Sequence, residues 1–117
     1  MMFIWILVAH WIGDYVFQTS KMAMGKSRHL KWLAIHVGTY TLVISICCLF
    51  LFPIKIAISY FLINGILHGI TDFFTSRLSA KYQKTPRIFF PILGFDQLIH
   101  MITLYLTFIH KNALVFF

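Results

Sequence analysis

Each acidic residue of this chain stands four positions from a histidine. The three pairs are His10/Asp14, His68/Asp72 and Asp96/His100. On an α-helix, residues four apart lie on one face, so each pair presents an imidazole and a carboxylate together. These are the ligand types that suit zinc and similar divalent ions. The spacing therefore predicts a metal site assembled from several helices.

The segments that carry these pairs are apolar. The chain of 117 residues is 60% hydrophobic and only 11% charged, and its mean hydropathy is +0.83. A soluble domain has about 25% charged residues, so the composition indicates a membrane protein. A carboxylate at membrane depth is costly and marks a functional site by default. The pairs are thus expected to form a buried polar site within the bilayer.

Four spans of about 20 residues fit this length with short connections. We expect them at residues 3–20, 32–52, 54–76 and 91–109, within a single domain covering residues 1–117. Pro53 would form the tight turn between the second and third spans, and Pro91 suits the first turn of the fourth. The predicted fold is all-α, an antiparallel bundle of four transmembrane helices.

Most of the ten lysines and arginines fall in two clusters, at residues 21–31 and 77–87. The positive-inside rule places both clusters in the cytoplasm and the N- and C-termini outside. The net charge of +7 is therefore read as a topology signal, with membrane lipids as partners and no nucleic acid. The apolar surface of four short helices is also compatible with a homo-oligomer.

Helical rise of about 1.5 Å per residue places the three aspartates in one layer of the cytoplasmic half. His36 of the second span falls at the same level, and the paired histidines lie about one turn deeper. The predicted metal ligands are His10, Asp14, His36, His68, Asp72, Asp96 and His100. This set suffices for one or two divalent ions, and its four imidazoles without any glutamate favour zinc or manganese over iron.

Further polar residues continue the faces of the ligand helices. They are Gln18, Lys21, Tyr40, Asn64, Ser76 and Arg77. Such residues are expected to orient the ligands or to contact a substrate. Lys21 or Arg77, near the inner mouth, would hold an anionic headgroup.

A metal pair in a partly open site can activate water and clamp a phosphoryl or acyl group. The favoured function is therefore a metal-dependent hydrolase acting on a lipid-soluble ester or phosphate. The alternatives are Asp–His contacts that only hold helices together, a metal or proton pathway, and a small interaction subunit with a structural polar core. Haem bound by paired histidines would leave the carboxylates unexplained.

Three strings carry a family resemblance: HWIGDYVFQ at 10–18, HGITDFFTSR at 68–77 and DQLIH at 96–100. Together with His36 they resemble the small bacterial and phage membrane proteins grouped as domain of unknown function 3307. His10, Gly13, Asp14 and Gln18 match the family's first motif, whereas Thr75 stands where the family often has lysine. The resemblance implies a bacterial inner-membrane protein, similar in style to membrane-bound metal-dependent hydrolases.

Overall fold

The chain folds into helices alone throughout the part that the structure, a computed structural model, describes: residues 2–117. In chain order the elements are α1 (Met2–Trp11), the π-helical turn η1 (Ile12–Val16), α2 (Ser20–Gly25), α3 (Leu30–Leu51), α4 (Ile54–Lys81) and α5 (Pro86–Ile109). The predicted all-α class is confirmed.

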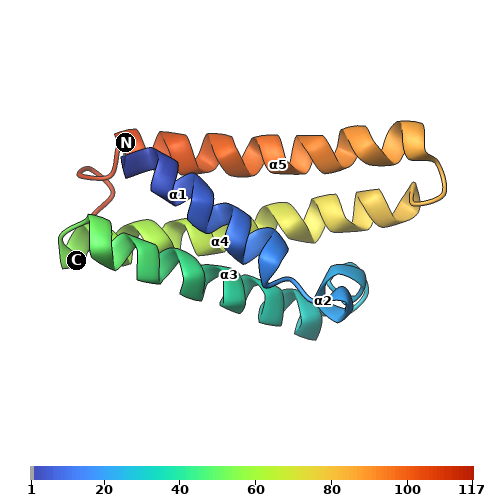
Figure 1. Cartoon of the computed structure of the whole chain (residues 1–117), viewed down its shortest axis with the longest axis horizontal. Coiled ribbons are helices and arrows are strands. Elements are labelled where there is room, and N and C mark those ends of the chain that lie inside the picture. The colour runs from blue at the N-terminus through green and yellow to red at the C-terminus, as the bar shows by residue number, and fades with distance from the viewer. Residues whose placement is uncertain (1) are drawn as a thin grey trace.

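The long helices α3, α4 and α5 run antiparallel along the 45 Å axis of the molecule, and α1 crosses them obliquely (Figure 1). The first segment packs against α3 and α5, while α4 lies between α3 and α5. Figure 1 places both termini and the α3–α4 turn at one end, and α2 with the α4–α5 connection at the other. Both basic clusters therefore lie at the same end of the bundle, as the sequence pattern requires.

Three helices, α3, α4 and α5, are long and apolar enough to cross a membrane. Their outward side chains are large and apolar: Phe50 is 87% exposed and Phe74 is 66% exposed. The apolar segment Met2–Val16 is shorter, and at about 1.5 Å per residue it reaches roughly 22 Å, less than the roughly 30 Å hydrocarbon core. The bundle thus has three helices that could span a membrane and one shorter apolar segment.

The first segment ends earlier than the predicted range 3–20. Its α-helical hydrogen bonding stops at Trp11, and the wider π-turn carries the chain to Val16. Thr19 then caps α2, because its hydroxyl accepts a hydrogen bond from the Met22 backbone at 3.2 Å. Gly13 allows the π-turn to approach α3 closely: a Cβ there would lie 3.1 Å from the Tyr40 ring. π-Turns of this kind often occur at functional sites.

The start of the last helix corrects a second expectation. We placed the first turn at Pro91, but α5 begins at Pro86, which takes the N-terminal position, and Pro91 lies inside the helix. The proline ring removes the hydrogen bond that residue 91 would donate to Arg87. Only one helical turn precedes that point, so the loss affects the end of the helix. Because α4 also extends to Lys81, the connection shortens to residues 82–85.

The interior divides into two halves. Near the termini the core is mainly apolar, with Ile6, Ile44, Cys48 and Leu104 at most 1% exposed. In the other half, the buried residues are mostly histidines and aspartates. Apolar packing therefore closes one end of the bundle, and the polar site lies toward the basic end.

Candidate metal centre

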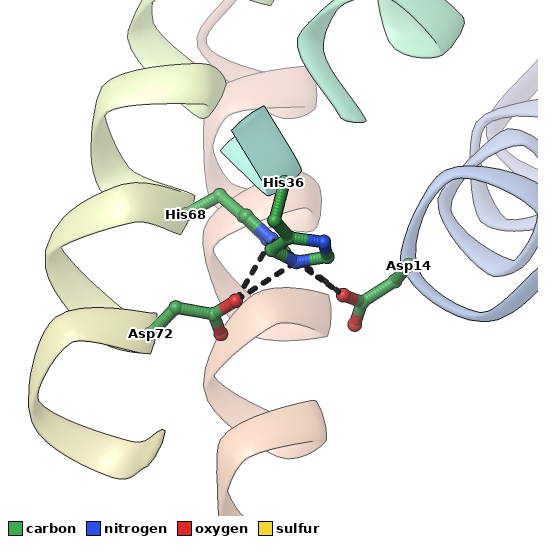
Figure 2. A group of neighbouring side chains, drawn as sticks. All are labelled: Asp14, His36, His68 and Asp72. Carbon is green, nitrogen blue, oxygen red and sulfur yellow. Dashed lines mark hydrogen bonds and ion pairs between the residues drawn. The ribbon is translucent and has the colours of Figure 1, made fainter. Parts of the chain in front are cut away.

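Four side chains from three elements converge at the centre of the polar half: Asp14 on η1, His36 on α3, and His68 with Asp72 on α4 (Figure 2). Each offers one ligand atom, and these atoms lie within 4.8 Å of one another. None of the four residues is more than 3% exposed. We call this set the first group.

Five of the six separations within the first group are close to the edges of a tetrahedral metal site. From His36 Nε2, the distances are 3.1 Å to Asp14 Oδ1, 3.0 Å to Asp72 Oδ2 and 3.1 Å to His68 Nε2. His68 Nε2 lies 3.3 Å from Asp72 Oδ2 and 3.6 Å from Asp14 Oδ1. Metal bonds of about 2.0–2.1 Å give tetrahedral edges of about 3.3–3.4 Å. These five separations are compatible with the ligand atoms of one divalent ion.

Hydrogen bonding alone accounts poorly for this arrangement. His36 Nε2 carries at most one proton, which points in a single direction. Yet two carboxylate oxygens and another ring nitrogen lie within 3.1 Å of that atom. The remaining lone pairs face one another in a buried space, and a cation relieves that repulsion. The donor set therefore fits a divalent ion.

A second group of three, Asp14, Asp96 and His100, shares Asp14 with the first. Asp72 of the first group also contacts the second, because its Oδ1 lies 3.0 Å from His100 Nε2. His100 Nε2 is also 3.2 Å from Asp96 Oδ1. Three protein ligands with an open position are typical of catalytic sites, whereas four are typical of structural ones. The two groups thus differ in the number of ligands they offer.

His10 lies beside the second group, and both of its ring nitrogens have other partners. Gln97 Nε2 donates to Asp14 Oδ2 at 2.8 Å and to Asp96 Oδ2 at 3.0 Å, which turns the amide oxygen toward His10. His10 Nε2 then donates to that oxygen at 2.9 Å, and Nδ1 accepts from the Tyr40 hydroxyl at 2.9 Å. His10 therefore links the Tyr40 hydroxyl, through the Gln97 amide, to the carboxylates of Asp14 and Asp96.

Stacked rings hold the imidazoles in place. The Tyr40 and His68 rings lie 3.7 Å apart at 7°, and the His68 and His100 rings lie 4.2 Å apart. The Nδ1 atoms of His36 and His68 are buried and have no hydrogen-bond partner among the described residues. Packing, rather than a hydrogen bond to Nδ1, therefore fixes the plane of the His68 ring and aims its Nε2 at the centre.

Lys26 supplies a cation that the sequence did not suggest. Its Nζ lies 3.2 Å from Asp72 Oδ2, and its side chain is only 16% exposed. Lys26 follows α2, and the break in the first segment brings that short helix back beside the bundle. Gln97 was missed as well, although it directly follows Asp96 in the DQLIH string. Its position next to Asp96 was the indication that the sequence offered.

The other predicted residues have different surroundings. Arg77 folds back on α4, donating to the Phe73 carbonyl at 2.8 Å and lying 3.8 Å above the Phe73 ring. Lys21 is exposed on α2, so it does not continue the His10/Asp14 face. Asn64 donates to Thr107 Oγ1 at 2.9 Å, deeper in the bundle than the two groups. The structure therefore gives Lys21, Arg77 and Asn64 no contact with the site.

A cavity of about 460 Å³ begins beside the second group. Its wall includes Asp96 itself, together with Gln18, Lys26 and Ser76. The cavity lies among α2, α4 and α5, and it reaches Asp96 from the basic end of the bundle. Gln18 and Ser76, predicted to be near the ligands, line this approach.

No curated protein and no solved structure matches the chain significantly. The match that exists is to a family model, and it covers residues 2–116. The strings that carry the His/Asp pairs all lie within this range. Because the match extends over nearly the whole chain, the chain belongs to the family described as protein of unknown function, DUF3307.

Proposed function

We propose that this chain is an intramembrane zinc protein of the bacterial inner membrane that hydrolyses a lipid-soluble ester or phosphate near the cytoplasmic side. The observation that carries the proposal is the convergence of four buried ligand atoms at 3.0–3.6 Å edges. This spacing favours zinc over manganese, because manganese prefers octahedral oxygen sites. The positive-inside rule places the basic end of the bundle in the cytoplasm and both termini outside.

The second group supports hydrolysis rather than a purely structural role. It offers three ligands, and one of them, Asp96, lines the cavity. A divalent ion held there would act as a Lewis acid on an ester or phosphoryl group. Gln97 holds Asp14 and Asp96 by hydrogen bonds, so both carboxylates stay oriented before a substrate arrives. Thr75 also donates a hydrogen bond to Asp96.

A pathway for ions or protons across the membrane has less support. Such a pathway needs polar side chains beyond the His/Asp layer. Toward the termini, the interior is instead filled by side chains such as Ile6, Ile44 and Leu104, each at most 1% exposed. Asn64 and Thr107 are buried there but bond to each other. The cavity at the basic end is therefore the approach that the proposed reaction uses.

The test combines metal content with hydrolysis. Protein purified in neutral detergent is expected to contain zinc, measured by mass spectrometry of the elements, and to release phosphate or fatty acid from short-chain lipids. Asp96→Asn should lower the rate at least about 100-fold, because altering even the residues around metal ligands costs 10–100-fold. Asn64→Ala is the matched control, since Asn64 is equally buried but outside both groups. Zinc-loaded protein that releases neither phosphate nor fatty acid from these lipids would contradict the hydrolase assignment.

A further inference from the structure

The cavity beside Asp96 has two chemically different walls. Lys26 and Arg28 bring positive charge to one side, while Phe89, Ile92 and Leu93 of α5 form an apolar side. Phe90 does not line the cavity and is 63% exposed, so this part of α5 also has an apolar outer surface. In a bilayer that surface would face acyl chains, so the apolar wall adjoins the lipid phase. The cavity therefore combines a cationic pocket with an apolar exit.

Two buried polar atoms in this wall have no partner. Ser76 is 6% exposed, and its hydroxyl has no hydrogen-bond partner among the described residues. Gln18 Oε1 is likewise buried and unpaired. Buried polar groups are normally satisfied, and an exception calls for a missing partner. Because both residues line the cavity, a polar ligand within it would supply that partner.

Lys26 connects this cavity to the metal ligands. Its ammonium group lies 3.2 Å from Asp72 Oδ2, and the same side chain lines the cavity. An anion bound at Lys26 would therefore lie next to Asp72 and Asp96. Arg28 adds a second donor, of the type that binds phosphate oxygens in pairs. No hydrogen bond of the Arg28 side chain occurs among the described residues, so this donor is available.

We propose that the cavity binds a phosphate-bearing amphiphile, with its phosphate at Lys26, Arg28 and Ser76 and its acyl chain along the apolar wall of α5. This assignment rests on the proposed function, because it names the substrate class of the same site. Charge complementarity selects the phosphate, and the exit toward lipid selects an acyl chain over free phosphate. The Ser76 hydroxyl would donate a hydrogen bond to a phosphate oxygen, which would supply the partner that this buried group lacks.

The proposal is tested by calorimetric titration of the full-length protein in neutral detergent. The probes are short-chain phosphatidic acid, diacylglycerol with the same acyl chains, and inorganic phosphate. Phosphatidic acid should bind one molecule per chain, at least tenfold more tightly than either other probe. Equal binding of diacylglycerol would overturn the phosphate contact, and equal binding of inorganic phosphate would overturn the amphiphile.

Three variants and a matched control complete the experiment. Lys26→Gln and Arg28→Gln should each weaken phosphatidic acid binding at least tenfold, and Ser76→Ala about threefold. Lys21→Gln removes the same charge from the same basic cluster but outside the cavity, so it should bind as the wild type does. An equal loss of phosphatidic acid affinity in Lys21→Gln would mean that the basic cluster attracts anionic lipids without a specific site, and would overturn the proposal. Thermal unfolding of each variant checks its fold, and Ser76→Ala, the smallest change, keeps the test valid if another variant unfolds.

The outcome is separable from that of the proposed function. Tight binding of phosphatidic acid by protein that hydrolyses nothing would remove the hydrolase and leave the binding site. Zinc-dependent hydrolysis of a neutral ester without binding of phosphatidic acid would retain the hydrolase and overturn the substrate class.

Discussion

Asp72 is the carboxylate that contacts three of the buried histidines within 3.3 Å. Its oxygens lie 3.0 Å from His36, 3.3 Å from His68 and 3.0 Å from His100. Lys26 approaches to 3.2 Å. Asp72→Asn keeps the size of the side chain and removes its charge, so it isolates the electrostatic part of metal binding. We expect this variant to lose its metal while remaining folded.

The magnitude follows from ligand chemistry. Residues that only orient metal ligands contribute 10–100-fold to affinity, so a charged ligand of the first group that also contacts His100 should contribute at least about 100-fold. At zinc one hundred times above its dissociation constant, the wild type gains about 2.7 kcal/mol of stability. At the same zinc concentration, a variant that binds 100-fold more weakly gains about 0.4 kcal/mol. Most of the zinc-dependent stabilisation should therefore disappear in Asp72→Asn.

The assay measures thermal unfolding in detergent, with zinc and with a chelator, beside the metal content of each sample. Wild type and Asn64→Ala should both unfold at a clearly higher temperature with zinc. Asp72→Asn should show almost no difference between the two conditions. The reasoning is refuted if Asp72→Asn retains stoichiometric zinc and the full rise, or if the wild type shows no rise. Either result would mean that these side chains hold the helices together without an ion.

Three further predictions use other parts of the molecule. Gln97→Met removes the hydrogen bonds to Asp14 and Asp96 and should weaken zinc binding about 10–100-fold. The affinity is measured by competition with a chromophoric chelator, and the control Gln83→Met should bind zinc as the wild type does. Imidazoles must be deprotonated to bind metal, so zinc retained on dialysis should fall as the pH drops from 7.5 toward 5.5, and a pH-independent content would contradict histidine ligation. The positive-inside rule predicts that both termini lie outside, so alkaline phosphatase fused after Phe117 should be active and a fluorescent protein fused there should be dark. The reverse pattern would contradict this topology.

The sequence predicted which residues meet, because helical spacing and apolar length are local properties. Each His/Asp pair shares a helix face at four-residue spacing, and equal depth follows from the rise per residue. In the structure, His36 joins His68 and Asp72 from a different helix at the depth expected. These expectations needed no knowledge of loops.

The residues that were missed depend on how the chain turns. Lys26 reaches Asp72 only because the first helix ends at Val16 and α2 folds back beside the bundle. Nothing in an apolar run that continues to Phe17 signals this break. The start of the last helix was also misplaced. It was assigned to Pro91, but Pro86, five residues earlier, takes that position. His10, predicted as a ligand, instead bonds to Gln97, because the Gln97 amide donates to two carboxylates and turns its oxygen toward the imidazole.

Lys26 also changes the charge balance of the buried site. The three carboxylates carry three negative charges, and Lys26 with one divalent ion restores neutrality. A second divalent ion would leave two uncompensated positive charges in a low-dielectric interior, which is costly. A phosphate dianion in the adjacent cavity would cancel those two charges. Under the proposed function, one ion at rest and a second that arrives with a phosphate ligand would keep this site neutral at both stages. Lys26, which contacts Asp72 and lines the cavity, would lie between the two.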